Sequence, residues 1–148
     1  MGAVEPIIHS RTRLWKYIHY AGPIRSRFLM ELRDNKRIMG TKCPICKRVY
    51  VPARSTCYVC FKPMDEWVEV SNEGTLMTYT VVHKAEPAHP IETPFTYGII
   101  KLDGADTSIA HLIDEVNQEN LRIGMRIQVV FKDERVGSIL DIKYFRPI

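Results

Sequence analysis

Four cysteines are the residues of this sequence whose type and spacing are best suited to chemistry. They form two Cys-x-x-Cys pairs, Cys43 with Cys46 and Cys57 with Cys60, separated by ten residues, and the 148-residue chain has no other cysteine. Each pair can hold one side of a metal ion, and four thiolates at about 2.3 Å from Zn²⁺ complete a closed tetrahedral site of the structural kind. The spacing therefore predicts a structural zinc ion held by all four side chains.

The sequence leaves other uses of these cysteines open. One Cys-x-x-Cys pair alone is typical of a redox dithiol at a helix N-terminus, and two pairs can also form disulfides. Metal binding is favoured because the pairs frame a short segment flanked by Pro44, Pro52 and Pro63. Lys47 and Phe61 directly follow the two pairs, where a ribbon often uses glycine for a left-handed backbone, so we expect a small strain there.

A second group of polar residues lies in the middle of the chain. Imidazole and carboxylate side chains recur there at every third residue: His83, Glu86, His89 and Glu92. Because Pro87 and Pro90 exclude a helix, a polyproline conformation with about three residues per turn would be needed to align them. A second metal site or an acid and base pair is one interpretation, and an exposed polar loop is the favoured one.

Motifs for catalysis by this chain alone are absent from the sequence. No serine lies in a Gly-x-Ser-x-Gly elbow, and neither a glycine-rich phosphate loop nor a His-Glu-x-x-His pair occurs. Because every cysteine is assigned to the metal, we expect no catalytic residue here and no enzyme that acts alone.

Charge is distributed unevenly along the chain. Residues 1–62 carry 13 Lys or Arg and 3 Asp or Glu, a balance of +10, whereas residues 63–148 carry 8 and 14, a balance of −6. The basic residues of the first part include Arg11, Arg13, Lys16, Arg25, Arg27, Lys36, Arg37, Lys42, Lys47, Arg48 and Arg54. This part is expected to bind an acidic protein face or a phosphate-bearing ligand, with a solvated basic face as the alternative.

Two helices are predicted before the cysteines. Ser10 can cap a helix over residues 11–20, where apolar residues recur at helical spacing. A second helix begins after Pro23 and ends near Asp34. Its apolar side consists of Ile24, Phe28, Leu29 and Leu32. Both helices are too short to be stable alone, so their apolar sides must pack on the rest of the chain or on a partner.

Alternation with period two replaces the helical pattern after Trp67. The strand-like stretches are residues 74–84, 95–102, 107–113, 127–131 and 140–144. In the last stretch Leu140 is expected on the buried side and Asp141 on the exposed side. Five strands, one of them long enough to curl between two sheets, predict a five-stranded OB-fold barrel, with a β-sandwich as the alternative. Gly74 and Gly98 are expected where strands bend.

The predicted protein is therefore mainly β with a short α-helical N-terminus. Charge and periodicity divide it into an N-terminal helical arm (1–39), a rubredoxin-like zinc ribbon (40–65) and an OB-fold domain (66–148). A ribbon this short has almost no hydrophobic core, so metal binding must supply most of its folding free energy.

Composition indicates a soluble globular protein. Hydrophobic residues make up 45% and charged residues 26%, and no apolar run approaches the about 20 residues of a membrane span. The N-terminal residues lack the charged start and apolar block of a secretory signal. We therefore expect a cytoplasmic protein with no membrane partner, whose thiols stay reduced and available to metal.

Several segments, taken in order, resemble one protein family. They are residues 40–54 around the first cysteine pair, the second pair, Trp67-Val-Glu-Val, residues 74–83, Pro94-Phe95-Thr-Tyr97, residues 121–125 and the ending Tyr144-Phe145-Arg146-Pro147. Over roughly residues 28–148 this order is similar to that of thiolase-associated zinc-ribbon plus OB-fold accessory proteins. Lys47, Phe61 and the longer N-terminal arm depart from the family pattern.

The resemblance implies a non-catalytic accessory subunit of an acyl-CoA thiolase complex. Its partner would be a thiolase-like or ketoacyl-synthase-like enzyme that holds the catalytic residues and shares the CoA thioester. The N-terminal extension is similar to that of accessory subunits in bacterial aromatic degradation, among them the benzoylsuccinyl-CoA thiolase of anaerobic toluene breakdown. Arg48 and Arg54 are our candidates for charge-assisted hydrogen bonds to the CoA phosphates.

Binding of single-stranded nucleic acid is the alternative function for a zinc ribbon joined to an OB barrel. The barrel half carries the balance of −6, which repels a phosphate backbone. Its aromatic residues fit a core as well as a stacking platform: Tyr79, Phe95, Tyr97, Phe131 and Tyr144. Nucleic acid is therefore not the expected partner.

Overall fold

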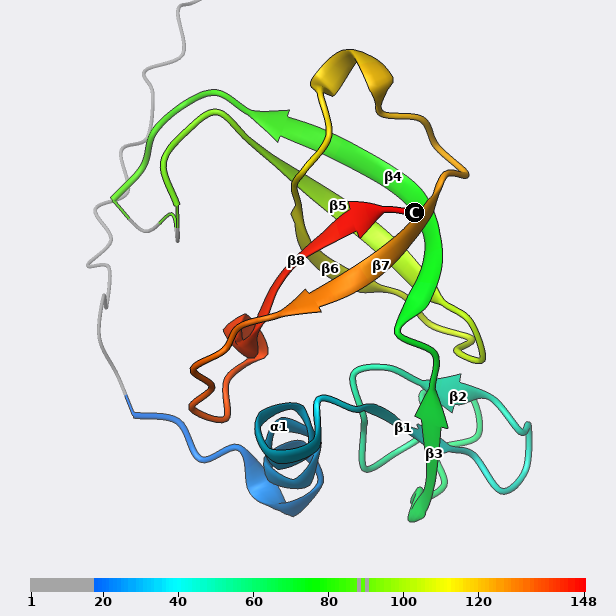
Figure 1. Ribbon diagram of the computed structural model, residues 1–148. Coiled ribbons are helices and arrows are strands. Elements are labelled where there is room, and N and C mark those ends of the chain that lie inside the picture. Colours follow the sequence, from blue (N-terminus) through cyan, green and yellow to red (C-terminus); the bar gives the residue numbers. More distant parts are fainter. Residues whose placement is uncertain (1–17, 88, 90) are drawn as a thin grey trace, which may run out of the picture.

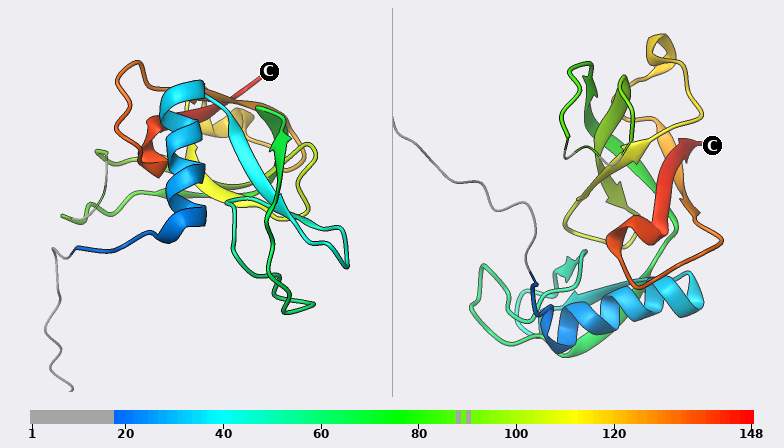
Figure 2. Two further views of the ribbon diagram at one scale, coloured as in Figure 1. Left: turned by 90° about the horizontal axis from the view of Figure 1, so that it is seen from below. Right: turned by 90° about the vertical axis from the view of Figure 1, so that its left-hand side faces the viewer.

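The computed structural model describes residues 18–87, 89 and 91–148, which form three packed parts. Helix α1 (Gly22–Asn35) and a small three-stranded sheet lie side by side at one end of a closed five-stranded barrel (Figures 1 and 2). No helix in this part of the chain is long and apolar enough to cross a bilayer. The arrangement confirms the predicted fold class, a mainly β protein with a short helix before a ribbon and a barrel.

Helix α1 is the second of the two predicted helices. Pro23 lies in its first turn, where the missing N–H group costs no hydrogen bond. Lys36 ends the helix in a left-handed conformation, with φ of 52°. The predicted apolar side packs on the core, fully for Phe28 and Leu32 and partly for Ile24 and Leu29. This contact, rather than helix propensity, accounts for the stability of so short a helix.

The first predicted helix, residues 11–20, falls mostly outside the described residues. Residues 18–20, which are described, are not helical. Within the described residues, it is the second predicted helix that packs against the core.

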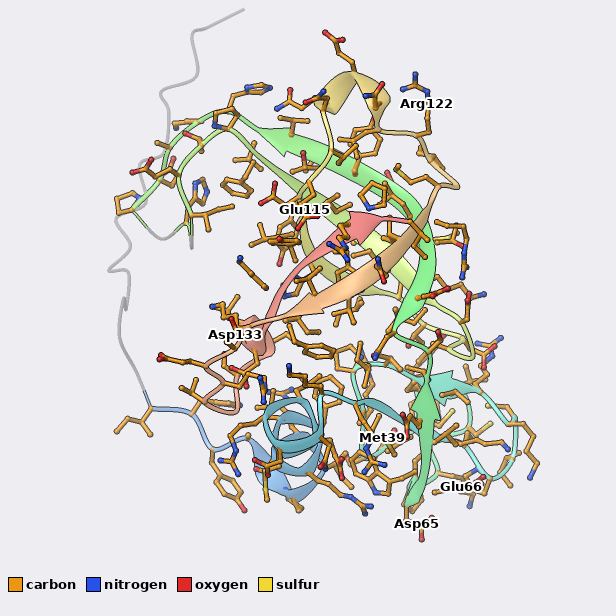
Figure 3. The ribbon with its side chains drawn as sticks, viewed as in Figure 1. Met39, Asp65, Glu66, Glu115, Arg122 and Asp133 are labelled. Atoms are coloured by element: carbon orange, nitrogen blue, oxygen red, sulfur yellow. The ribbon has the colours of Figure 1, made fainter. Side chains whose placement is uncertain are left out.

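The ribbon contains an antiparallel sheet in the order β2-β1-β3. Its strands are β1 (Ile38–Lys42), β2 (Val49–Tyr50) and β3 (Glu66–Val70). β3 starts at Glu66 (Figure 3), where the OB-fold domain is predicted to begin, yet it pairs with β1 along its whole length. Residues 66–70 therefore complete the ribbon sheet before the chain enters the barrel. The division of the chain into domains stays a prediction.

The barrel contains five strands, as predicted. They are β4 (Glu73–Val82), β5 (Phe95–Leu102), β6 (Ile109–Ile113), β7 (Arg126–Phe131) and β8 (Ile142–Pro147), with a 3-10 turn η1 (Gln118–Asn120) before β7. Their order, β4-β5-β6-β8-β7, closes where β7 pairs with β4, and β6 meets β8 in parallel. The closed order confirms the OB-fold barrel and excludes the β-sandwich.

The start of the last strand was predicted wrongly. Residues 140–144 do not alternate, because Ile139–Asp141 form a 3-10 turn (η2) and β8 begins only after it. Leu140 is 41% exposed, whereas Asp141 is 2% exposed. The Asp141 carboxylate accepts hydrogen bonds of 3.0, 2.8 and 3.1 Å from the backbone N–H groups of Val136, Gly137 and Ser138. These three donors stabilise the buried charge, and a buried leucine would leave them unpaired.

Hydrogen bonds from the backbone of Val49, in β2, and of Val51, just after it, join the ribbon to the barrel. The N–H of Val49 donates to the Asp106 carboxylate and the N–H of Asp106 donates to the Val49 carbonyl, both at 2.9 Å. The Thr107 hydroxyl bonds the N–H and the carbonyl of Val51 at 2.8 and 2.9 Å. The turn between β5 and β6 thus occupies the free edge of β2, and one hydrophobic core continues from α1 through the ribbon into the barrel.

Arg135, in the loop between β7 and η2, fixes the end of α1 against the barrel. Its Nε donates to the carbonyl of Arg33 at 2.7 Å, and its Nη1 donates to the carbonyls of Lys132 and Asp133 at 2.7 and 2.9 Å. The last carbonyls of a helix have no partner within the helix, so this contact satisfies one of them. α1, the ribbon and the barrel are therefore held in one arrangement.

Gly74 and Gly98, where bends are predicted, are points of close approach. A Cβ atom at Gly74 would lie 2.4 Å from the carbonyl oxygen of Lys101 and 2.8 Å from the Cα of Leu102. A Cβ atom at Gly98 would lie 2.4 Å from the Cδ1 of Ile113, the end of a flexible side chain. Backbone atoms cannot move aside as a side chain can.

We expect Gly74→Ala to destabilise the zinc-loaded protein more than Gly98→Ala does. Overpacking costs about 1–3 kcal/mol, and Gly98→Ala should fall at the lower end of that range because Ile113 can change rotamer. Gly74→Ala should reach the upper end or exceed it. Urea unfolding in the presence of Zn²⁺ measures both losses, and equal losses would contradict this account.

Candidate functional site

The four cysteine side chains converge as a tetrahedral metal site requires. Their sulfur atoms all lie within 4.8 Å of one another, and the sulfurs of Cys46 and Cys57 are 3.7 Å apart. Four sulfurs at about 2.3 Å from one Zn²⁺ ion are about 3.8 Å from each other. A disulfide would need about 2.05 Å, and all four cysteines are free. The donor set therefore fits zinc and does not fit the disulfide interpretation.

The backbone repeats one conformation at the two cysteine pairs, which we call the knuckles. The N–H of Lys47 donates to the carbonyl of Cys43 at 3.0 Å, and the N–H of Phe61 donates to the carbonyl of Cys57 at 2.9 Å. The φ angles of Lys47 and Phe61 are 62° and 54°. The left-handed backbone expected after each pair is thus present, with its strain, on side chains that are not glycine.

Hydrogen bonds concentrate negative charge on Cys57. Burial alone would raise the pKa of its thiol, but the Tyr50 hydroxyl donates to its sulfur at 3.1 Å and the N–H of Cys60 at 3.4 Å. Together with a further backbone N–H, these donors lower the pKa of Cys57 to about 6.

Cys60 shows why the cluster requires a cation. Burial, as the larger effect, and the neighbouring thiols, as the smaller one, raise the pKa of Cys60 to about 12. One thiolate therefore suppresses the ionisation of the others, and a divalent cation at the centre removes that repulsion. Because all four donors come from the protein, a metal bound there would offer no position to water or substrate and would act as a structural cross-link.

Tyr50 is a residue of this site that the sequence reasoning missed. Its side chain is fully buried beside Cys43, Cys57 and Met64, and its hydroxyl has the Cys57 sulfur as partner. That hydrogen bond is the largest cause of a raised pKa of Tyr50, and burial is the next. The hydroxyl therefore stays neutral and donates. A buried tyrosine in the strand between two cysteine pairs is a signal, since its hydroxyl needs a partner there.

The two candidate phosphate ligands have different surroundings. Arg48 is exposed and its Nη1 donates to the Tyr58 hydroxyl at 3.1 Å. Arg54 has its backbone clamped, because the Thr41 hydroxyl bonds both its N–H and its carbonyl at 2.9 and 2.8 Å. Arg54 lines a groove of about 640 Å³ between α1 and the ribbon, and Arg48 does not. The structure thus does not bring the two arginines together at this groove.

The polar group in the middle of the chain lies in the loop between β4 and β5. The N–H of His89 donates to the carbonyl of Glu86 at 3.0 Å, and the Glu86 carboxylate pairs with exposed Lys84 at 3.1 Å. The His89 ring packs edge-on against Phe95 at 5.2 Å. Within the described residues the cysteines are the one group that converges as metal ligands, so the loop interpretation of His83, Glu86, His89 and Glu92 is favoured.

Two family models match adjacent parts of the chain. The rubredoxin-like zinc ribbon domain of ChsH2 matches residues 30–65, and the C-terminal OB-fold domain of ChsH2 matches residues 67–132. Fold, cysteine geometry and both matches define the class, a zinc-ribbon protein with a C-terminal OB fold. The chain belongs to the family of ChsH2-type zinc-ribbon and OB-fold proteins, which confirms the family resemblance found in the sequence.

Relatives extend the comparison to whole proteins. A DUF35 domain-containing scaffold protein of Methanocaldococcus jannaschii is 28% identical over 122 residues, 79% of this chain and 86% of that protein. A probable enoyl-CoA hydratase alpha subunit of Thermomonospora curvata is 26% identical over 121 residues, 81% of this chain and 36% of that protein. The solved Ltp2-ChsH2(DUF35) aldolase shares the fold, with a TM-score of 0.63 and 22% identity over 87% of this chain and 98% of that chain.

We expect one zinc ion per chain, and we expect chelation to unfold the ribbon. Hydrogen exchange should show protection of the amides between Cys43 and Cys60 with zinc and loss of that protection without it. Cys57→Ser should lose stoichiometric zinc and the same protection. A metal-free chain with a fully protected ribbon would contradict the assignment.

We expect Tyr50→Phe to weaken zinc binding while the ribbon still folds at saturating metal. The substitution removes the hydroxyl that donates to Cys57 and leaves the buried ring in place. Loss of such a supporting hydrogen bond typically lowers metal affinity by about 10- to 100-fold. Tyr58→Phe is the control, because Tyr58 is 54% exposed and accepts from Arg48 instead. Competition with a chromophoric chelator measures both affinities, and equal affinities would refute the role of Tyr50.

Proposed function

We propose that this protein is a non-catalytic accessory subunit that docks on a thiolase-type acyltransferase and supports the binding or transfer of CoA thioesters. The observation that carries the proposal is Phe61. Its φ is 54°, a conformation that glycine adopts without strain, and its side chain is 78% exposed. An aromatic side chain that stands on a left-handed backbone and is mostly exposed in the described chain is explained by contact with another protein.

Phe61 is one of four exposed apolar or aromatic side chains of the two knuckles, which together are here called the knuckle patch. Its exposed members are Ile45, Tyr58, Val59 and Phe61. Lys47, Arg48 and Lys62 are basic neighbours of these residues in the sequence, and all three are exposed. Apolar side chains inside a charged rim are typical of protein interfaces, and these basic residues favour an acidic partner face.

The names of the related proteins support an accessory role for this chain. One is a scaffold protein, one is a subunit of an enoyl-CoA hydratase, and the structural relative is an aldolase named for two components. Each name refers to work with another component or on a CoA thioester. The thiolase type of the partner and the aromatic substrate rest on the sequence resemblance, and both are part of the proposal.

Binding of single-stranded nucleic acid has less support. Stacking on an OB barrel requires several aromatic rings on its outer surface. Of the five barrel aromatics considered from the sequence, Tyr97 is exposed at 39%, whereas the other four are partly buried. One exposed ring on a barrel half with a balance of −6 is a poor platform for phosphates.

Co-expression with a thiolase-type enzyme encoded beside this chain tests the proposal. We expect the two to purify as a complex and thiolysis by the complex to exceed that by the enzyme alone. The isolated chain should bind oligonucleotides weakly or not at all at physiological salt. Failure to co-purify, together with tight and salt-sensitive oligonucleotide binding, would reverse the choice between the two functions.

The knuckle patch can be tested without disturbing the fold. Phe61→Gly should leave the zinc-loaded ribbon as stable as before or more stable by about 1 kcal/mol, because glycine removes the left-handed strain. It should weaken the complex with the thiolase-type enzyme at least about ten-fold, as the loss of an aromatic anchor does. Lys47→Gly is the matched comparison for strain, since it relieves the same strain at the other knuckle, with φ of 62°. It removes a basic side chain and no apolar one, so it should weaken the complex less than Phe61→Gly does. If both variants bind alike, Phe61 is not the anchor.

A further inference from the structure

The groove beside Arg54 is built by all three parts of the fold, and we call it the helix-ribbon groove. α1 contributes one wall, ribbon residues 52–56 contribute the other, and Ile139 of η2 closes the end towards the barrel. The lining residues are Ala21, Ile24, Arg25, Phe28, Leu29, Pro52, Ala53, Arg54, Ser55, Thr56 and Ile139. Figure 2 shows α1 and the ribbon side by side below the barrel, where this groove lies.

The groove combines an apolar floor with positive charge and no negative charge. Its apolar part comes from Phe28, Ile24, Leu29 and Ile139, which pack on the core. Arg25 and Arg54 are its charged residues, and no Asp or Glu is among the lining residues. A second groove of about 580 Å³, at the barrel, contains both acidic and lysine side chains and lacks this imbalance.

Arg25 and Arg54 lack the carboxylate partner that four of the ten arginines of the described chain have. Arg33, Arg37 and Arg126 form ion pairs of 2.7, 2.8 and 2.5 Å with carboxylates. Among the described residues no carboxylate pairs with either groove arginine, and Arg25 contacts only the ring of His19, at 3.4 Å. Two arginines that line one groove without an acid beside them can serve an anionic ligand.

The surroundings of the two arginines also favour an anion. Ser55 and Thr56 lie in the same wall and carry hydroxyl groups that can donate to phosphate oxygens. α1 starts at this groove with no side-chain cap on Ala21 and no acidic residue in its first turn, so the positive end of its dipole is not neutralised there. The clamp from Thr41 on the backbone of Arg54 limits the freedom that binding would otherwise remove.

We propose that the helix-ribbon groove binds the phosphate end of a phosphate ester that carries an uncharged arm, as a CoA thioester does. Arg25 and Arg54 hold the phosphates from opposite walls, and the arm lies along the apolar floor of α1. This inference rests on the proposed function and revises its site: Arg25 replaces Arg48 as the partner of Arg54.

The position of the groove also couples ligand binding to the metal. Residues 52–56 lie between Cys46 and Cys57, so the wall that carries Arg54 is part of the segment closed by the metal site. Chelation of zinc therefore removes one wall of the groove. Binding of the ligand to the chain should require zinc even though the metal itself makes no contact with it.

Titration of the zinc-loaded full chain with CoA, measured by isothermal calorimetry, tests the proposal. We expect CoA and adenosine 3′,5′-bisphosphate to bind, pantetheine to bind more weakly, and affinity for CoA to fall as salt increases. Arg25→Ala and Arg54→Ala should each weaken CoA binding about ten-fold or more, the loss typical of a charge-assisted contact. Neither variant should change the weak binding of pantetheine. Protein from which a chelator has removed the zinc should bind no CoA.

Two arginines serve as controls of equal charge. Arg48 lies in the same ribbon outside the groove, and Arg122 lies at the end of the barrel remote from α1, as Figure 3 shows. Arg48→Ala and Arg122→Ala should bind CoA within about two-fold of the unchanged chain, because distant surface charges are screened. Equal losses in all four variants would mean general attraction by a basic surface and would overturn the proposal.

Other outcomes also decide the matter. Absence of CoA binding to the zinc-loaded chain at millimolar concentration overturns the groove assignment. Binding of an acidic peptide as tightly as CoA, with the same dependence on Arg25 and Arg54, also overturns it. Co-purification with the thiolase-type enzyme is measured separately. A chain that joins the enzyme but binds no CoA therefore refutes this inference and leaves the proposed function standing.

Discussion

The convergence of four thiol groups in a segment with almost no core is the constraint on which the rest of the structure depends. Between Cys43 and Cys60 the fully buried side chains apart from the cysteines are few, and Tyr50 is the largest. Four close sulfurs repel each other once more than one is ionised, so the segment is stable only with a cation at its centre. The free energy of metal binding therefore supplies most of the free energy of folding of this segment.

That local constraint has consequences at a distance because of what the segment touches. β2 lies between the knuckles, and its outer edge is bonded to Asp106 and Thr107 of the barrel. The helix is fixed from the other side by Arg135. A metal site that positions β2 therefore also positions the barrel relative to α1, and the helix-ribbon groove and the knuckle patch keep a fixed geometry. A rigid surface loses little conformational entropy when a partner binds.

The sequence was sufficient for features that depend on local pattern. The cysteine spacing identified four side chains that converge as metal ligands do. The residue positions after each pair identified the left-handed backbone at Lys47 and Phe61, and period-two alternation identified β5 with both ends correct. These features need only neighbouring residues, since chelation, backbone sterics and sheet pleat act over a few positions.

Features that depend on tertiary contacts were missed. Asp141 looked like the exposed position of a strand, and its burial depends on three N–H donors that a bend in the preceding loop brings to it. The pairing of β3 with β1 was not predicted, because alternation does not specify which strand is the neighbour. Arg25 and Arg54 are 29 positions apart in the sequence, and only the packing of α1 on the ribbon places them on one groove.

Lys47 and Phe61, the two strained residues after the cysteine pairs, have side chains that the fold does not require. Lys47 and Phe61 have nearly the same backbone conformation, with φ of 62° and 54°, and glycine would satisfy the fold at both. A left-handed conformation costs about 1 kcal/mol at each residue, and neither side chain recovers it by burial in the described chain, since both are exposed. Under the proposed function, the benefit lies in the complex. A lysine suits an acidic surface and an exposed phenylalanine suits an apolar pocket, so the two knuckles would match a partner face that carries both.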